Sequence, residues 1–216
     1  MKKKLEPMGQ FFNDRADIYD NAHLGHISDS GGMEGKELVA QYLPEDTRDI
    51  LDLGCGTGLE LPAIFARFPQ AKVVGIDLAQ DMLALLHERC AGFDVQTLCM
   101  SYFDYKFPPE ACDAVISVMS LHHFTPAQKL ELFTGVRKTL RPGGVFLNCD
   151  YFANSPMQER MNFAKLVLKR QKAGETHFDT PLTAGHEMKL LRQAGFAQID
   201  ILWQQGTAKL IQAATA

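Results

Sequence analysis

Three glycines at alternate positions, Gly54, Gly56 and Gly58, are the first residues whose spacing is suited to chemistry. They follow the short apolar run 50–53 directly. A strand that ends in glycines just before a helix is how an α/β sheet builds a cofactor site. A dinucleotide-binding loop has the spacing Gly-x-Gly-x-x-Gly. Leu59 occupies the third glycine position of that pattern, so the loop is not a typical diphosphate cradle.

Two aspartates indicate which cofactor the loop takes. Asp52 lies within the strand end, where its negative charge would repel a diphosphate and favour an ammonium or sulfonium group. Asp77 ends the next apolar run, 19 residues after Gly58, close to the interval of ~20 at which an acidic side chain binds ribose hydroxyls. A ribose and a cation without phosphate describe S-adenosylmethionine better than NAD. An NAD-linked oxidoreductase and a non-enzymatic cofactor-binding module are the alternatives.

Two adjacent histidines, His122 and His123, follow the predicted strand 114–118. We expect them at the carboxyl edge of the sheet, where ligands bind in this architecture. Imidazole titrates near neutral pH, so either ring could take a proton from a hydroxyl or ammonium acceptor. They are the candidate catalytic residues. The alternatives are that they only line the pocket, or that one caps the following turn while the other packs under Phe124.

These residues must be positioned by alternating strands and helices. The spacing of apolar residues and the content of β-branched residues predict a mainly parallel, doubly wound α/β sheet. The loop 204–207 is so short that the two strands beside it must form a C-terminal antiparallel hairpin. Arg141-Pro142-Gly143-Gly144 is the predicted turn before the fifth strand. The predicted strands are 50–53, 72–76, 95–99, 114–118, 144–149, 198–203 and 208–213, and the predicted helices are 81–89, 126–140, 156–172 and 183–194.

Two further helical stretches precede the glycine loop, at 8–19 and 33–42, with the glycine-rich segment Gly25 to Gly32 between them. The first could form a lid, and we interpret residues 1–43 as an N-terminal helical cap. Phe12, Ala16 and Tyr19 share one face at helical spacing, so an alternative is that they only dock this helix on the core.

Bulk properties limit the class of protein. A chain of 216 residues with a net charge of −4 fits a single domain over 1–216, and the run Lys2 to Lys4 is typical of a solvated terminus rather than a nucleic-acid arm. With neither a signal peptide nor an apolar stretch of the ~20 residues that a membrane span needs, we expect a cytoplasmic protein without membrane or nucleic-acid partners. The five cysteines are expected to be reduced core thiols, and no metal site is expected. The oligomeric state stays open.

The segments Leu-Asp-Leu-Gly-Cys-Gly-Thr-Gly and Gly75-Ile76-Asp77-Leu78 resemble those of the class I S-adenosylmethionine-dependent methyltransferases. Residues 121–124 and 141–144 and the terminal hairpin are similar to that superfamily as well. The resemblance implies a seven-stranded sheet in the order 3-2-1-4-5-7-6. It also implies that Gly54 to Gly58, with Cys55, pass under the methionine part of the cofactor, that Asp77 binds the ribose, that Leu78 and Met82 flank the adenine, and that a backbone carbonyl near Ser117 or Val118 faces the amino group.

One position departs from the superfamily pattern. Many members carry an aspartate after the third strand that binds the adenine amino group, whereas Ser101 stands there in this chain. Ser101 with Tyr102, or Asp104 instead, would then cap the adenine edge. The resemblance also implies that Tyr19 packs near the sulfonium and that Arg15 pairs with the cofactor carboxylate.

The predicted function is in-line transfer of a methyl group from S-adenosylmethionine to a small-molecule acceptor, with S-adenosylhomocysteine as product. Residues 150–151 and 177–180 are second-rank candidates for orienting the acceptor, whose identity the sequence leaves open.

Overall fold

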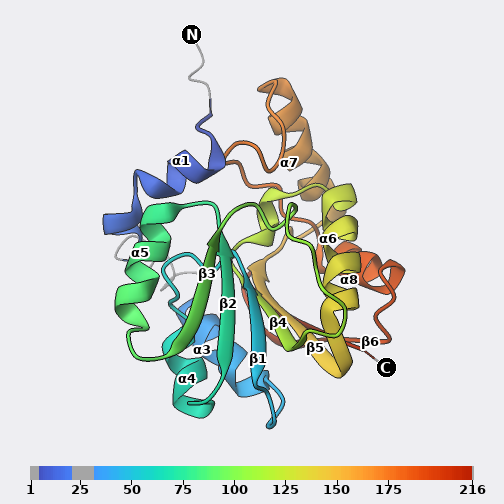
Figure 1. Ribbon diagram of the computed structural model, residues 1–216. Coiled ribbons are helices and arrows are strands. Elements are labelled where there is room, and N and C mark those ends of the chain that lie inside the picture. The colour runs from blue at the N-terminus through green and yellow to red at the C-terminus, as the bar shows by residue number, and fades with distance from the viewer. Residues whose placement is uncertain (1–4, 21–31, 216) are drawn as a thin grey trace.

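A computed structural model of the chain describes residues 5–20 and 32–215. Seven strands form one sheet in the order β3-β2-β1-β4-β5-β7-β6 (Figure 1). Strands β1 to β5 are parallel, and β7 runs antiparallel to both β5 and β6. The predicted strand order and the terminal hairpin are therefore confirmed. The strands are β1 (Asp49–Leu53), β2 (Lys72–Asp77), β3 (Asp94–Cys99), β4 (Cys112–Val118), β5 (Leu140–Tyr151), β6 (Gln198–Gln205) and β7 (Ala208–Ala214).

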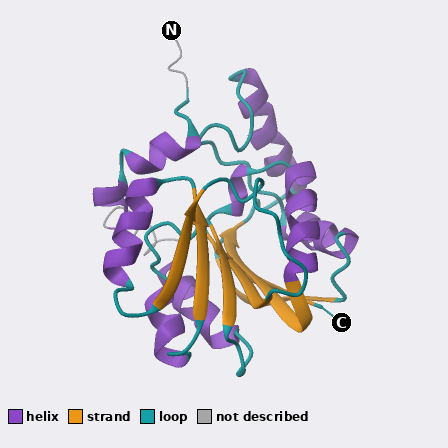
Figure 2. Cartoon of the chain, in the orientation of Figure 1, coloured by secondary structure: helices purple, strands orange, loops and turns teal. Residues whose placement is uncertain are grey.

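Helices cover both faces of this sheet (Figure 2). Buried side chains of α3, α4 and α5 pack against one set of strand residues, and those of α6 and α8 pack against the other set. Successive residues of β1 alternate between the two layers, with Ile50 in the first and Leu51 in the second. A central strand that is buried on both faces has a nearly continuous apolar sequence, and this pattern is why residues 50–53 could be predicted to form a strand. The helices are α3 (Gly32–Tyr42), α4 (Leu61–Arg67), α5 (Gln80–Arg89), α6 (Pro126–Thr139) and α8 (Ala184–Gln193).

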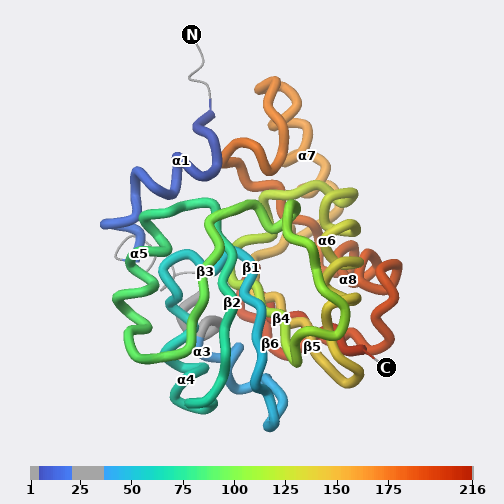
Figure 3. Tube along the Cα trace, in the orientation of Figure 1, coloured from blue at the N-terminus to red at the C-terminus, as the bar shows by residue number. Residues whose placement is uncertain are grey.

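Two segments far apart in the sequence meet above the carboxyl edge of the sheet (Figure 3). One is the N-terminal stretch with α1 (Met8–Asn13), and the other follows α7 (Pro156–Leu168). The amide of Met8 donates to the Glu175 carbonyl at 3.2 Å, and the amide of His177 donates to the Glu6 carbonyl at 3.0 Å. We call residues 5–20 and 173–179 together the cap.

The N-terminal helical prediction is met in part. The stretch 8–19 is interrupted by a turn at 14–15 and is helical again at 16–20. Helix α3 packs against α4, β5 and β7. Lys2 to Lys4 and all but the last residue of Gly25 to Gly32 lie outside the described residues, so the interpretation of 1–43 as a cap stays a prediction.

Two local expectations are wrong. Residues 141–144 do not form a turn before β5, because β5 begins at Leu140 and carries these residues as a bulge opposite β4. Cys99 is exposed at the end of β3, while the other four cysteines are buried and all five are free. Within 5–20 and 32–215, no helix has the length and apolar character to span a bilayer.

Candidate functional site

The glycine loop between β1 and α4 has a backbone that side chains rarely permit. Gly54, Gly56 and Gly58 all have positive φ, at 77°, 50° and 69°. A Cβ at position 54 would lie 2.1 Å from the Ser120 Oγ, and one at 58 would lie 2.9 Å from the Leu86 side chain. Glycine is therefore required by backbone conformation at each position and by a neighbour at two of them.

Asp77 joins this loop to the end of β2. Its carboxylate accepts the amide of Gly56 at 2.9 Å and the amide of Ala79 at 2.9 Å. Burial raises the pKa of Asp77, and the N–H donors of Ala79, Gly56 and Leu78 oppose that rise. The carboxylate thus fixes the loop and faces a cavity beside it.

Asp52 lies inside the protein rather than in the cavity. Its side chain is fully buried, and burial together with the nearby Glu60 carboxyl raises its pKa well above the usual range. A raised pKa favours the neutral acid, which presents no charge to attract a cation. The predicted contact of Asp52 with the cofactor therefore has no support from its position and stays untested.

A cavity of about 250 Å³ opens at the carboxyl edge of the sheet, beneath the cap. Predicted site residues that line it are Tyr19, Gly54, Gly56, Asp77, Leu78, Met82, Ser101, Tyr102, Val118 and His123. Residues missed by the sequence prediction that also line it are Met8, Phe12, Phe103, Met119, Ser120, Phe124, Gln128, Gly174 and Glu175. The missed ones come largely from the cap and from the turn after β4, whose approach to the loop depends on tertiary packing.

The remaining predicted residues do not line the cavity. Ser117 is buried, and its hydroxyl donates to the Leu53 carbonyl at 2.9 Å. Cys55 and Gly58 pack beneath the loop, against β2 and α5. Arg15 pairs with Glu6 at 2.8 Å instead of facing the cavity, and its guanidinium lies over the Phe11 ring.

Tyr19 both docks the cap and lines the cavity. It packs with Phe12 against a buried group that includes Ala16 and Met82 of α5, so the docking interpretation is supported. The next residue, Asp20, accepts the Thr57 hydroxyl of the glycine loop at 2.7 Å. These contacts hold the Tyr19 ring beside the loop.

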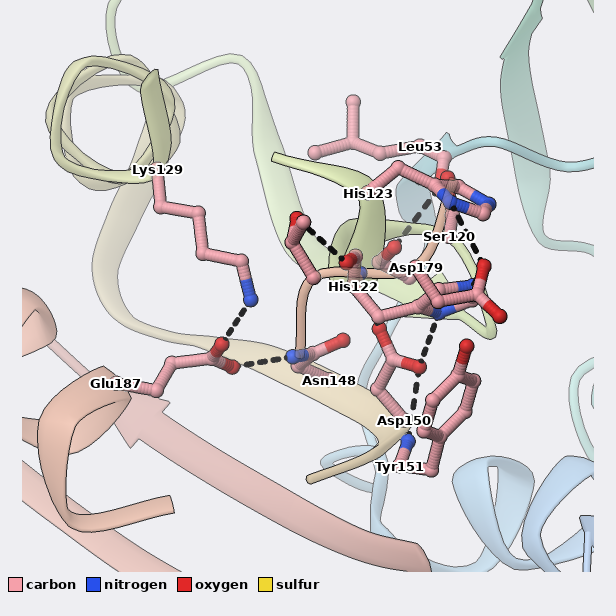
Figure 4. Close-up of polar contacts among 12 residues, drawn as sticks. Leu53, Ser120, His122, His123, Lys129, Asn148, Asp150, Tyr151, Asp179 and Glu187 are labelled. Carbon is pink, nitrogen blue, oxygen red and sulfur yellow. Dashed lines mark hydrogen bonds and ion pairs between the residues drawn. The ribbon is translucent and has the colours of Figure 1, made fainter. Parts of the chain in front are cut away.

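His122 is oriented by Asp150, at the end of β5 (Figure 4). The Asp150 Oδ1 lies 2.7 Å from the His122 Nδ1, and its Oδ2 accepts the His122 amide at 3.0 Å. Burial would raise the pKa of Asp150, but the His122 ring, the positive charge of Lys129 and the Tyr151 amide lower this pKa overall. The ionised carboxylate therefore accepts a hydrogen bond from the Nδ1 proton and fixes the orientation of the ring.

His123 is oriented by the cap. Its Nδ1 lies 3.3 Å from the Phe178 carbonyl and 3.3 Å from the Asp179 Oδ1, so two acceptors favour the proton on that nitrogen. Burial, followed by the neighbouring His122, lowers the pKa of His123 to about 4. The neutral ring thus keeps a lone pair on Nε2 and lines the cavity.

Comparison with known proteins identifies the family of the chain. Residues 50–144 match a family described as "Methyltransferase domain". The ubiquinone biosynthesis O-methyltransferase of Dinoroseobacter shibae is 33% identical over 200 residues, which cover 90% of this chain and 77% of that protein. The carboxy-S-adenosyl-L-methionine synthase of Trichodesmium erythraeum is 28% identical over 182 residues, with 76% and 70% covered.

Solved structures share the fold. An O-methyltransferase family protein from Burkholderia thailandensis superposes with a TM-score of 0.69 at 20% identity, over 93% of this chain and 59% of that one. Three other solved proteins are matched over 51% to 64% of their length, whereas two are matched over 98% of theirs. At such identities the similarity concerns the fold alone.

Proposed function

This chain belongs to the S-adenosylmethionine-dependent methyltransferases, and from this premise we propose that it methylates a hydroxyl group of a small molecule. S-adenosylmethionine is the methyl donor, so the NAD-linked alternative is set aside. The observation that carries the proposal is the cavity, which brings the glycine loop, Asp77 and the His123 ring to one space beneath the cap.

The donor fits one part of this cavity by the chemistry of its lining. Asp77 would accept the ribose hydroxyls, and Gly54 and Gly56 would let the methionine part approach the backbone. Leu78 and Met82 would flank the adenine, with Ser101 and Tyr102 at its edge. Tyr19 would offer its ring face to the sulfonium, since an aromatic face attracts a cation.

Transfer itself needs alignment and a proton acceptor. The donor would supply the methyl group: the acceptor oxygen would bond to the methyl carbon, and the sulfur would keep the electron pair of the broken carbon–sulfur bond in S-adenosylhomocysteine. We assign the released proton to the His123 Nε2. His122, which Asp150 holds in place, would pack against the His123 ring and keep that ring oriented. The cap supplies alignment and excludes water.

Two observations support a small hydroxyl-bearing acceptor, namely the size of the cavity and the name of a relative. The cap residues Met8, Phe12 and Glu175 line the same small cavity, which suits a small acceptor better than a folded macromolecule. The name of the Dinoroseobacter shibae relative specifies O-methylation in ubiquinone biosynthesis. An aromatic hydroxyl is therefore the first acceptor class to try.

Calorimetry and a product assay test the proposal. We expect saturable binding of S-adenosylmethionine and S-adenosylhomocysteine and none of NAD. We then expect S-adenosylhomocysteine release with at least one member of a panel of phenols, catechols, carboxylic acids and amines. Donor binding without product from any acceptor would instead favour the non-enzymatic binding module, and product only from a protein or nucleic acid would contradict the small-molecule assignment.

A further inference from the structure

Three potential metal ligands converge where the turn after β4 meets the cap (Figure 4). The Asp179 Oδ1 lies 3.3 Å from the His123 Nδ1 and 3.7 Å from the His122 Nε2. One ligand atom from each of the three residues lies within 4.8 Å of the others. Ligand atoms bound at about 2.0 to 2.2 Å to one ion stand roughly 3 to 3.5 Å apart, so two of the three separations are already near those of a coordinated set.

The surroundings of this cluster are those of a built site. Asp150 binds the His122 Nδ1 at 2.7 Å, which turns the Nε2 atom of the ring toward Asp179, 3.7 Å away. A carboxylate on the far nitrogen of a liganding histidine fixes its tautomer and raises its basicity. Both imidazoles are buried, whereas the Asp179 side chain is 49% exposed and provides a path from solvent.

We propose that His122 Nε2, His123 Nδ1 and Asp179 Oδ1 bind one divalent transition-metal ion of the zinc type. Two imidazole nitrogens and one carboxylate favour Zn²⁺ or Co²⁺ over Mg²⁺, which prefers oxygen ligands. The cysteines predict no metal site, whereas the ligands of this cluster are histidines and an aspartate that come together only in the fold.

Binding of the ion requires one proton to leave. The His123 Nδ1 would exchange the proton that it shares with Asp179 and the Phe178 carbonyl for the metal, and that proton passes to solvent. One imidazole cannot hold the ion on Nδ1 and keep that proton, so metal binding and the base role of His123 describe two alternative states of the centre.

Titration with Co²⁺ tests the site without any activity assay. The untagged chain would carry Cys99→Ser, because an exposed thiol also binds such ions. We expect one equivalent of Co²⁺ to produce visible absorption bands, Zn²⁺ to abolish them by competition, and excess Mg²⁺ to leave them unchanged. Absence of saturable one-to-one binding would overturn the proposal.

Variants locate the ion. Asp179→Ala removes an exposed ligand with little risk to folding and is expected to weaken Co²⁺ binding more than 10-fold. Asp150→Asn, which only weakens the support of His122, is expected to cost about 10- to 100-fold. His186→Ala is the matched control, because His186 pairs with Glu159 at 2.6 Å and is not part of the cluster. Equal affinity in the wild type and Asp179→Ala would place the ion elsewhere. Because binding is measured without a donor or an acceptor, its failure leaves the proposed methyl transfer untouched.

Discussion

The two edges of the sheet use acidic residues in opposite ways. At the amino edge, where β1, β4 and β5 begin, Arg141 pairs with Asp49 at 2.8 Å and with Asp113 at 2.6 Å. These three side chains are partly exposed. At the carboxyl edge, Asp150 is deeply buried and Asp77 is partly buried, and these two carboxylates accept backbone amides and, at Asp150, an imidazole.

This difference in partners indicates that the acids at the amino edge stabilise the fold, whereas those at the carboxyl edge serve the site. An acid paired with a guanidinium near solvent has its charge neutralised and offers little to a ligand. A more buried acid that is held by amides or by an imidazole keeps acceptor capacity in a low-dielectric place, where a ligand can use it. Substitutions of the same residue type at the two edges should therefore give different phenotypes.

The largest expected difference concerns histidine. His123→Ala should lower kcat about 10²- to 10⁴-fold, the range of a general base, while donor affinity changes little. His87→Ala is the control, because this ring in the last turn of α5 binds the partly buried Thr97 hydroxyl and does not line the cavity. Single-turnover measurement of S-adenosylhomocysteine formation separates chemistry from release. An unchanged rate in His123→Ala would remove this ring from proton transfer.

Glycine gives a second matched pair. Gly54 and Gly143 have nearly the same φ, 77° and 76°, but an added Cβ would meet Ser120 at position 54 and nothing within 4 Å at position 143. Gly143→Ala should cost only the left-handed strain, about 1 to 2 kcal/mol. Gly54→Ala adds overpacking, for a total of roughly 2 to 5 kcal/mol, and should also abolish tight donor binding. Urea unfolding and calorimetry measure both; equal losses in the two variants would mean that Ser120 moves aside freely.

Much of this comparison could be predicted from the sequence, but not all of it. Apolar runs and glycines located the strands and the loop, because these depend on local period and backbone conformation. Asp150 and Asp179 are second-rank candidates from the sequence, but their contacts with the two histidines could not be predicted, since these contacts depend on how β5 and the cap pack. The burial of Asp52 could not be predicted, because an acidic residue at the end of a strand is expected to be exposed and only the tertiary packing shows that it is covered.

Aspartate at the carboxyl edge is the next test. Asp77→Ala should weaken S-adenosylmethionine binding by ~1 to 3 kcal/mol, because charge-assisted hydrogen bonds to the ribose are lost. Part of the effect would come from the Gly56 amide, which loses its acceptor. Asp113→Ala is the control and should leave donor affinity unchanged. The ribose assignment would not survive equal affinities in the wild type and Asp77→Ala.

The smallest expected effect is the pH dependence of the amino edge. Burial would raise the pKa of Asp113, but the amides of Asp49 and Arg48 and the Arg141 guanidinium lower it overall. A lowered folded-state pKa contributes stability above the unfolded-state value of 3.8, and that contribution is lost as the pH falls through the folded-state pKa. Asp113→Asn should therefore lower the free energy of unfolding by no more than about 1 kcal/mol at pH 7, since the group is partly exposed.

Urea unfolding between pH 7 and roughly pH 3 should show this difference shrinking at the acid end, near the ordinary aspartate pKa. A difference that is constant with pH would mean that Asp113 acts through its shape and neutral hydrogen bonds, so the two edges would then differ less in electrostatics than their contacts indicate.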